Sequence, residues 1–388
     1  MTVSLEQARI EARTAQRALA RWLVAEAYPL WSTQGVDRVR GGFQERLNAD
    51  GTPSEEPRRA RVQPRQVYCF AQAPSLGWKG DAKAIVAQGL DFFMKHYRRP
   101  DGLYRTLVAP DGRVLDDRVL LYDQAFALLA FAESRKVLGP TPQLDREGRH
   151  LLQAIQNHLA GPGWGFRSGL PADATLLSNP HMHLFEASLA WMAVDETIVW
   201  HDLADHIGSL ALSRFIDSAS GALREHFDLR WVPVHGIEGR IIEPGHQYEW
   251  AWLLLRWARP ARTEVKNAAL RLIEIAEEHG VRHGVAINAL LDDFSVHDGG
   301  ARLWPQTERV KAAALAARIT KDECYWGMAA AAANGLLRYL STDVRGLWYD
   351  RLTSEGTFIR EPAPASSFYH IVAAVAELST SLDATEPK

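Results

Sequence analysis

The chain has 388 residues, of which 47% are hydrophobic and 23% charged, and 44 basic against 47 acidic residues give a formal net charge of −3. A balance this close to neutral provides no basic surface for nucleic acid or an anionic membrane, and no apolar stretch reaches the roughly 20 residues of a transmembrane helix. Residues 1–16 are polar and lack the apolar core of a signal peptide, so we expect a cytoplasmic protein with no nucleic-acid or membrane partner.

The only two cysteines are Cys69 and Cys324. They fit neither a disulfide framework nor a zinc knuckle. Both lie among aromatic residues, so we expect each thiol to be buried in the core.

A turn made of glycine followed by a hydrophobic residue recurs along the whole chain, with a period of roughly sixty residues. Its first glycines are Gly42, Gly102, Gly163, Gly221, Gly284 and Gly346. Several of these turns open a short extended segment, as at 101–112 and 346–356. Such segments, closed by turn residues, predict β-hairpins.

Two kinds of helical pattern alternate between these turns. In 82–93, 151–159 and 265–276 apolar residues recur at helical spacing on one side, which predicts a helix with one solvated face. The second kind is apolar nearly all round and must be covered on both sides. It is found at 119–132, 183–194, 249–258 and 369–378.

The alternation predicts about twelve helices. We expect them near 3–31, 61–78, 81–98, 118–138, 142–160, 180–194, 198–217, 244–259, 262–280, 303–318, 322–340 and 363–384. Six amphipathic helices around six apolar ones form an all-α (α/α)6 barrel with short β-hairpins between helix pairs. No linker interrupts the period, so we expect residues 1–388 to form a single catalytic domain. An open solenoid is the alternative, but neither terminal repeat resembles a polar cap.

Polar residues cluster near the N-terminal end of each apolar helix. They are Arg65, Gln66, Tyr122, Asp123, Gln124, Asn179, His181, His183, Glu186, His246, Gln247, Glu249, Trp304, Gln306, Glu308, Ser366, Ser367, Tyr369 and His370. Pro180 and Pro305 suit first helical turns and so support this polarity. In a parallel inner ring these ends meet at one mouth, where helix dipoles favour an oxygen-rich ligand. Flat rings such as Trp304, Tyr369 and Trp250 suit a sugar, although not only a sugar.

Each of these residues also has a structural interpretation. A single histidine on an apolar helix is usually a core residue, but three at matching helix ends favour a site. Glu249 shares a helix face with His246 and could either cap the helix or hold the imidazole. Arg65 could form a structural ion pair. Asp123 and Glu308 suit supporting roles. We nevertheless expect Glu308, like Tyr122 and Asn179, to be a candidate for substrate binding.

The sequence lacks the usual signatures of metal and cofactor chemistry. His181 and His183 are two apart, on nearly opposite sides of a helix, and no HExxH motif or Cys/His cluster occurs. Phosphate loops, a GxGxxG after a strand and a GxSxG elbow are also missing. We therefore expect no metal ion and no cofactor.

Histidines beside an arginine suit proton transfer next to a carbonyl. In a sugar aldehyde, removal of the C2 proton gives a cis-enediolate. Protonation at C1 then makes the ketose, whereas protonation at C2 from the opposite face makes the epimer. Arg65 could stabilise the developing oxyanion.

The sequence resembles the N-acylglucosamine 2-epimerase family along nearly its whole length. This family has an (α/α)6 barrel and contains acylglucosamine epimerases, cellobiose 2-epimerases, mannose isomerases and sulfoquinovose isomerases. The matching segments are GGFQERLNADG (41–51), RQVYCFA (65–71), NPHMHLFEA (179–187), PGHQYEWAW (244–252), WPQTE (304–308) and SSFYH (366–370).

The resemblance implies functions for individual residues. His246 and His370 are similar to the family's pair of acid/base histidines, and Glu249 to the residue that orients His246. Arg65 is similar to the arginine that binds a substrate oxygen near C1 or C2. His183 is similar to a histidine implicated in ring opening or substrate binding.

The resemblance is strongest to the mannose isomerase branch. Trp304 is similar to the family's substrate-contact tryptophan. The histidine at position 183 argues against the acylglucosamine epimerases, and no phosphate loop supports their nucleotide dependence. The implied substrate is an unphosphorylated monosaccharide: mannose, converted to fructose, or lyxose, converted to xylulose.

Several alternatives remain open at this point. A 2-epimerase of the mannose or cellobiose type differs only in where the proton returns, and a sulfoquinovose isomerase would place a sulfonate near an arginine. A glycoside hydrolase on the same barrel needs two carboxylates, for which Asp123 and Glu308 are the candidates. A non-catalytic sugar-binding protein is a further class. The sequence does not decide whether the chain forms a homodimer.

Overall fold

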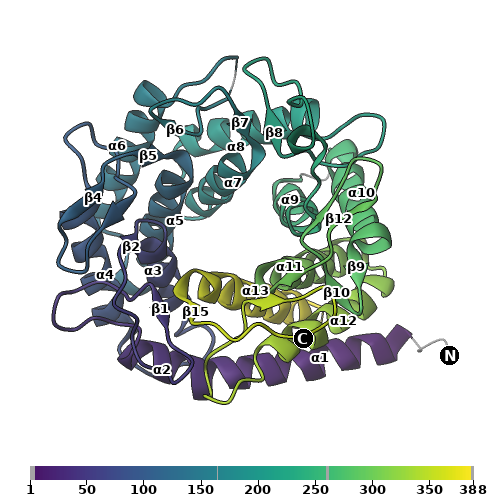
Figure 1. The fold of residues 1–388 in the computed structure, drawn as a ribbon, viewed down its shortest axis with the longest axis horizontal. Coiled ribbons are helices and arrows are strands. Elements are labelled where there is room, and N and C mark those ends of the chain that lie inside the picture. The colour runs from purple at the N-terminus through teal and green to yellow at the C-terminus, as the bar shows by residue number, and fades with distance from the viewer. Residues whose placement is uncertain (1–4, 164, 259–261, 386–388) are drawn as a thin grey trace.

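Two concentric rings of helices form the molecule in the computed structural model, which describes residues 5–385 except 164 and 259–261 (Figure 1). The inner ring consists of α3 (Val62–Gln72), α5 (Leu121–Leu138), α7 (Ser178–Met192), α9 (Pro244–Trp257), α11 (Leu303–Thr320) and α13 (Ala365–Asp383). The outer ring consists of α1 (Leu5–Trp22), α4 (Ala82–Tyr97), α6 (Pro142–His158), α8 (Ile198–Leu210), α10 (Thr263–Gly280) and α12 (Cys324–Tyr339). This arrangement is the predicted (α/α)6 barrel.

Short irregular turns extend two of the outer helices. α1 continues through a π-helical turn (Leu23–Ala27) into α2 (Tyr28–Thr33), and α8 continues into a second π-helical turn (Ala211–Phe215). A 3₁₀ turn (Glu238–Arg240) precedes α9. The helices expected near 3–31 and 244–259 include positions 3, 4 and 259, which lie outside the described residues, as does residue 164 of the third glycine turn.

Contacts between the first and last repeats close both rings. Inner helices touch in the order α3, α5, α7, α9, α11, α13, and α13 packs against α3 again, while α1 packs against α12. Stacked aromatic rings fill this seam: the centroids of Trp31 and Trp348 are 4.7 Å apart, and those of Trp31 and Phe368 are 5.7 Å apart. A stacked pair adds about 0.5–1.5 kcal/mol beyond the buried area. The closure excludes an open solenoid.

Short strands of two or three residues pair with one another at the N-terminal ends of the inner helices and connect neighbouring repeats. They are β1 (Arg46–Leu47), β2 (Arg58–Arg59), β3 (Leu107–Val108), β4 (Val114–Asp116), β5 (Val119–Leu120), β6 (Gly169–Leu170), β7 (Leu176–Leu177), β8 (His226–Phe227), β9 (Val281–Arg282), β10 (Val285–Ala286), β11 (Ala289–Leu290), β12 (Val296–Asp298), β13 (Ala301–Arg302), β14 (Arg351–Leu352) and β15 (Ala363–Pro364). The strand before an inner helix pairs antiparallel with a strand of the next repeat, as in β2–β3, β5–β6, β7–β8 and β13–β14. β15 pairs with β1, which joins the last repeat to the first.

Glutamines in the first turns of the inner helices hold the loops of these repeats. Gln306 accepts a hydrogen bond from the backbone N–H of Ala286 (2.7 Å) and donates to its carbonyl (2.8 Å). The same two-way bond is made by Gln63, Gln124 and Gln247. In the third repeat, His181 accepts from the N–H of Phe166 (2.9 Å). These side chains satisfy buried backbone groups, so they are structural.

The repeated glycines are required by their backbone conformation. The six first glycines have φ between 63° at Gly163 and 89° at Gly346. Side chains other than glycine are disfavoured there. The turn period found in the sequence therefore marks a repeated left-handed backbone position.

One expectation about the core is wrong. Cys69 is fully buried, as predicted, but Cys324 begins α12 on the surface and is exposed. An aromatic neighbourhood in sequence does not fix which side of an amphipathic helix a residue occupies. Among the described helices, none has the length and apolar content to cross a bilayer.

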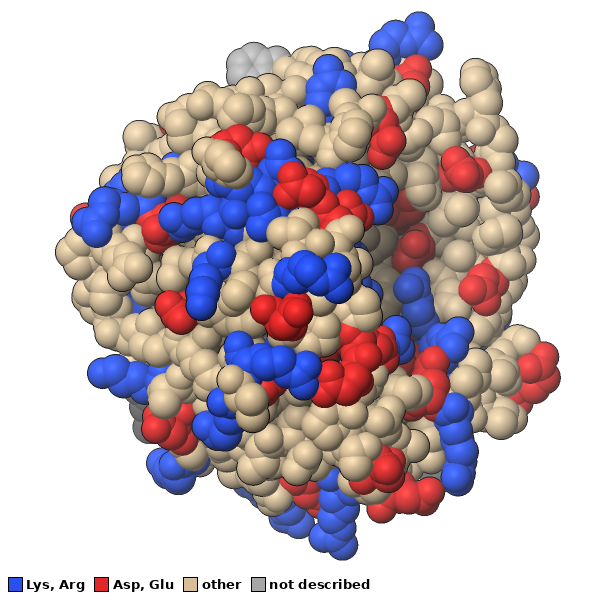
Figure 2. All heavy atoms as spheres, turned by 60° about the vertical axis from the view of Figure 1, so that its left-hand side comes forward, with Lys and Arg blue, Asp and Glu red and all other residues tan. Residues whose placement is uncertain are grey.

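On the face of the barrel that Figure 2 shows, neither sign of charge dominates. Figure 2 shows Lys and Arg interspersed with Asp and Glu across one face of the barrel. Many of them form ion pairs within the same loop, such as Arg118 with Asp116 (2.7 Å). This face provides no continuous basic track of the kind that binds nucleic acid.

Candidate active site

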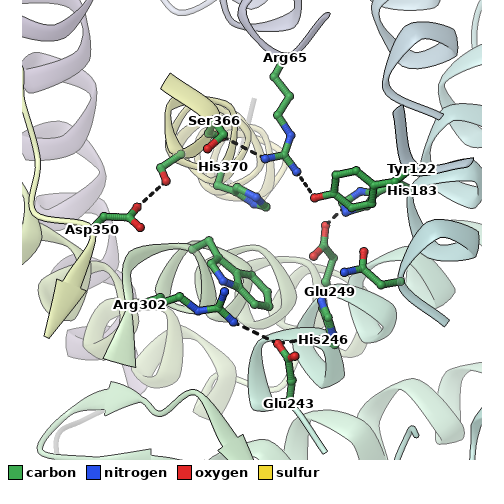
Figure 3. Close-up of a pocket in the computed structure, with 13 residues that line it drawn as sticks. Arg65, Tyr122, His183, Glu243, His246, Glu249, Arg302, Asp350, Ser366 and His370 are labelled. Carbon is green, nitrogen blue, oxygen red and sulfur yellow. Dashed lines mark hydrogen bonds and ion pairs between the residues drawn. The ribbon is translucent and has the colours of Figure 1, made fainter. Parts of the chain in front are cut away.

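A cavity of about 230 Å³ opens at the N-terminal ends of the inner helices (Figure 3). It is lined by Arg65, Tyr122, Asn179, His183, Glu243, His246, Glu249, Arg302, Trp304, Asp350, Ser366, Ser367 and His370. All six inner helices or the loops just before them contribute to it. The convergence of polar residues expected from the sequence is therefore present.

His246, in the first turn of α9, is surrounded by carboxylates. Its Nδ1 lies 3.0 Å from Oε2 of Glu225 and 3.8 Å from Oε2 of Glu243. Burial alone would lower the pKa of His246, but the negative charges of Glu225 and Glu243 outweigh it and raise the pKa to about 10. His246 is therefore an imidazolium at neutral pH.

His370, in the second turn of α13, has the opposite protonation. Its Nδ1 lies 2.8 Å from Oε1 of Glu308. Burial, together with the positive charges of Arg65 and Lys311, holds the pKa of His370 well below its usual value. His370 is a neutral imidazole and can accept a proton.

Trp304 lies between the two histidines. Its ring centroid is 5.0 Å from that of His246 and 5.8 Å from that of His370. A cationic acid and a neutral base thus border one cavity, with an indole beside both. Pairs of groups whose environments push their pKa values apart are typical of acid/base catalysis.

Arg65 reaches the cavity from α3. Its Nη2 donates to the hydroxyl of Tyr122 (2.5 Å) and its Nη1 to the carbonyl of Ser366 (3.3 Å). The guanidinium lies over Phe126, 4.1 Å from the ring centroid, and also contacts the ring of Tyr369. No carboxylate in the described part of the chain forms an ion pair with Arg65. Its charge is available to an oxygen in the cavity.

His183, on α7, is buried between aromatic rings and carboxyl groups. Its ring lies 4.8 Å from that of Tyr122 and 4.5 Å from that of Phe126. Nδ1 is 3.4 Å from Glu186 and 3.8 Å from Glu249. Burial lowers the pKa of His183 to about 3 in spite of Glu186. It therefore offers a neutral ring to the ligand.

Three buried carboxyl groups, of which Glu249 lines the cavity, interact with one buried lysine. Glu186, Glu249 and Glu308 are each at most 2% exposed, and Lys311 is 0% exposed. Burial and the charge of Glu308 raise the pKa of Glu249 well above its usual value. Glu249 is therefore the group of this cluster most easily protonated.

Two sets of side chains have donor atoms close enough to hold a metal ion. They are His183, Glu186 and Glu249, and Glu249, Glu308 and His370. In each set one carboxylate already has a partner: Lys311 pairs with Glu308, and Tyr369 donates a hydrogen bond to Glu186. Oε1 of Glu249, which belongs to both sets, has no hydrogen-bond partner among the described residues. In the set that contains Glu308, a metal ion would have to compete with the Lys311 ammonium.

The rim of the cavity holds residues that the sequence analysis missed. Arg302 donates to Glu243 (3.3 Å), and Ser367 donates to Asp350 (2.5 Å). Arg302 and Glu243 each stand directly before an inner helix, and that position was the available signal. Asp350 and Glu225 come from loops between helices, where no spacing rule indicates which way a side chain points.

Two expected contacts are absent. Glu249 was expected to orient His246, but the Nδ1 of His246 is held by Glu225, and Glu249 lies beside His183 instead. Helix-face geometry placed Glu249 correctly on the inner side of α9, but the imidazole turns toward the preceding loop. Glu308 was a candidate for substrate binding, but it lies outside the cavity lining, behind His370.

Other predicted candidates also lie outside the cavity lining. Trp250 stacks in the core against Phe185, and Tyr369 is buried with its hydroxyl on Glu186. Asp123 forms an ion pair with Arg61 (2.9 Å). Since neither Asp123 nor Glu308 lines the cavity, the carboxylate pair considered for a glycoside hydrolase is not assembled. The other candidates, Arg65, Tyr122, Asn179, His183, His246, Glu249, Trp304 and His370, do line it.

Comparison with known proteins gives consistent matches over most of the chain. A model of the N-acylglucosamine 2-epimerase (GlcNAc 2-epimerase) family matches residues 41–374. The chain is 48% identical to a mannose-6-phosphate isomerase of Rhizobium meliloti (strain 1021), covering 94% of this chain and 96% of that protein. It is 27% identical to a D-mannose isomerase of Thermobifida fusca, covering 87% and 88%. A crystal structure of a D-mannose isomerase superposes with a TM-score of 0.86 at 21% identity, covering 95% and 98%.

Proposed function

The chain belongs to the N-acylglucosamine 2-epimerase family of sugar isomerases and epimerases, and we propose that it interconverts D-mannose and D-fructose through a cis-enediolate, without a metal ion. The observation that supports this proposal is the opposite protonation of two histidines on one cavity. His246 is cationic and His370 neutral at the same pH. Aldose–ketose isomerisation needs one group of each kind.

His370 is the base in this scheme. Its free ring nitrogen takes the proton from C2 of the open-chain aldose, and the C–H electrons form the C1–C2 double bond while O1 becomes an oxyanion. The protonated His370 then delivers a proton to C1, which gives the ketose, and exchange of its N–H with solvent before delivery introduces deuterium in D₂O. The low pKa of His370 keeps it unprotonated when the sugar binds.

His246 and Arg65 act on the oxygen atoms O1 and O2 of the sugar. His246 donates a proton to O1 as negative charge develops there and receives one from O2 as the ketose carbonyl forms. Arg65 stabilises the enediolate with a fixed positive charge, which is worth most in a site shielded from water. His183 and Asn179 are placed to contact sugar hydroxyls. During ring opening His246 can also protonate the ring oxygen and take up the proton of the O1 hydroxyl as the aldehyde forms, which restores its charge for the next step.

We infer that the substrate has no phosphate group. Arg302 at the rim is already paired with Glu243, and Asp350 adds a second carboxyl group to the lining. A phosphate at the outer end of the sugar would meet these groups, while Arg65, the cavity-lining arginine without a carboxylate partner among the described residues, is engaged by the enediolate oxygen in this scheme. The name of the Rhizobium relative makes mannose 6-phosphate the second candidate.

The test is a comparison of kcat/KM for D-mannose and D-mannose 6-phosphate, with and without EDTA, followed by chromatography of the products. We expect fructose from mannose, faster turnover of the unphosphorylated sugar and no effect of EDTA. Preference for the phosphorylated sugar would contradict the assigned substrate. Loss of turnover in EDTA with recovery on adding a divalent ion would contradict the metal-free scheme.

Epimerisation at C2 is the alternative outcome for the same site. It would return the proton to C2 from the opposite face and would give glucose from mannose. The same scheme extends to D-lyxose and D-xylulose. A panel of mannose, glucose, lyxose, cellobiose and sulfoquinovose in D₂O, analysed by NMR, identifies both the substrate and the carbon that exchanges.

A further inference from the structure

Lys311 has no contact with solvent and is outside the cavity lining, on the inner helix α11. Its Nζ lies 2.5 Å from Oε2 of Glu308 and 3.8 Å from the centroid of the Trp252 ring. Fully buried lysines are rare unless they are paired. The negative charges of Glu308, Glu249 and Glu186 outweigh burial and raise the pKa of Lys311, so it remains an ammonium.

Glu308 connects this ammonium to the proposed base. One carboxylate oxygen pairs with Lys311, and the other lies 2.8 Å from Nδ1 of His370. Burial raises the pKa of Glu308, and the charge of Lys311 opposes that rise. The three side chains form a relay from the core to the cavity.

We propose that Lys311 is a positioning residue that fixes the tautomer of His370. The ammonium keeps Glu308 ionised, Glu308 accepts the Nδ1 proton of His370, and the Nε2 lone pair is left for the substrate. The hydrogen bond at one ring nitrogen decides which nitrogen is the base. This assignment rests on the proposed function, in which His370 removes the C2 proton.

Removal of the ammonium would reverse this arrangement. Glu186 from α7, Glu249 from α9 and Glu308 from α11 would then form a buried acidic cluster. Arg65 and the imidazolium of His246 are the remaining cations whose charges act on His370. Carboxyl groups this close cannot all stay ionised. Glu249, whose pKa is raised most, is protonated first, and Glu308, which loses its ion-pair partner while burial raises its pKa, takes up the next proton. The protonated Glu308 would donate a hydrogen bond to Nδ1. His370 would then carry its hydrogen on Nε2 and could not accept one from the sugar.

The test is Lys311→Met, with a neutral side chain of similar length. The readout is the ¹⁵N NMR spectrum of the imidazole nitrogens, with the His370 signals identified by their loss in His370→Gln. We expect the protonated nitrogen of His370 to change from Nδ1 to Nε2. We also expect kcat to fall at least about 10²-fold, the effect of losing a general base, with less change in KM.

Arg309→Met is the matched control. Arg309 is two residues before Lys311 on α11 and forms a buried ion pair with Glu277 (2.6 Å), away from His370. We expect this variant to lose stability but to keep the His370 signals and kcat of the native protein. If Lys311→Met behaves in the same way, Lys311 has only a structural function and the proposal is wrong.

A second comparison covers the case in which Lys311→Met does not fold. Glu308→Gln interrupts the relay, and Glu308→Gln with Lys311→Met removes both charges together. If Lys311 acts only through Glu308, the added substitution changes kcat by less than about threefold, because the two effects are not independent. A further fall of tenfold or more would overturn the proposal. Since the NMR measurement needs no substrate, it remains decisive even if no sugar is turned over, which would contradict the proposed function alone.

Discussion

The Nδ1 atom of His246 lies 3.0 Å from Oε2 of Glu225, which directly precedes β8 and also accepts a hydrogen bond from Ser178 (2.8 Å). Glu225 is thereby held in place from two sides. A fixed, buried carboxylate on one nitrogen of an imidazole stabilises its charged form and fixes the orientation of the ring. The protonation of His246 therefore depends on a residue outside the cavity lining.

Glu225→Gln is expected to move the alkaline limb of the pH–rate profile to lower pH. His246 has to be protonated to donate, so turnover falls as the pH rises through its pKa, which is about 10 in the native protein. The substitution removes the largest of the opposing charges, and the pKa then falls toward the ordinary value of about 6.5. The measurement is kcat/KM for mannose between about pH 5 and pH 10.5. This range covers the titration of an ordinary imidazole and that of His246 in the native protein.

The native protein should show a broad plateau in the same experiment. The acid limb lies below pH 6.5, because the pKa of His370 is well below that value. The exposed Glu238 provides the control: Glu238→Gln should leave both limbs unchanged. An alkaline limb that does not move in Glu225→Gln would show that His246 is not the titrating acid.

The same pKa shift predicts how stability depends on pH. The folded-state pKa of His246 is raised above the unfolded value, so its contribution to stability is fully present below pH 6.5 and is lost as the pH rises through about 10. Urea unfolding of native protein and Glu225→Gln should therefore differ most at low and neutral pH and converge as the pH approaches 10. A difference in unfolding free energy that stays constant across this range would contradict the assigned charge state.

His370→Gln is expected to abolish exchange of the C2 hydrogen. His370 is the base that removes the C2 proton in the proposed scheme, so both turnover and solvent exchange should fall at least about 10²-fold. Incubation of mannose in D₂O, followed by ¹H NMR of the C2 position, measures this directly. The exposed His235 serves as the control, since His235→Gln should exchange at the native rate. Exchange that persists in His370→Gln would assign the base elsewhere.

The regular part of the fold could be predicted because it repeats. The hydrophobic pattern of segments such as 82–93 is enforced by one solvated face, and the glycines by a left-handed backbone position, so both recur at fixed intervals in sequence. Ring closure was also predicted, although its details, such as the β1–β15 pair, were not. Those depend on contacts between the two ends of the chain, for which the sequence has no local signal.

The sequence predicted which residues meet at the site, but not which side chains they contact there. His246 and His370 could be placed at one mouth because parallel helices bring equivalent ends together. Their partners could not be assigned: Glu225 lies in a loop, and Glu308 reaches His370 from the neighbouring inner helix α11. The side-chain rotation that turns His246 from Glu249 toward Glu225 is decided by packing and by local charge, neither of which follows from helical spacing.

Arg65→Lys is expected to lower kcat more than it raises KM. The guanidinium makes two hydrogen bonds in different directions, to Tyr122 and to the carbonyl of Ser366, and an ammonium on a shorter stem cannot reproduce that geometry. Its charge acts on the enediolate oxyanion, which exists only after proton removal, so a loss of about 10²-fold in kcat is expected. Steady-state kinetics with mannose separates the two parameters. A change confined to KM would mean that Arg65 binds the sugar without stabilising the intermediate.

Gln306→Met is expected to destabilise the barrel without changing the residues that line the cavity. The glutamine satisfies both the N–H and the carbonyl of Ala286, and a thioether of similar size leaves two buried backbone groups unpaired. Each such group costs about 1–3 kcal/mol. Gln247→Met should behave alike, because it holds Leu223 in the same way. The exposed Gln153 on α6 is the control, with an expected change within about 0.5 kcal/mol. The unfolding free energy from urea titration checks all three variants, and equal values for Gln306→Met and Gln153→Met would show that the glutamine bonds do not hold the loops.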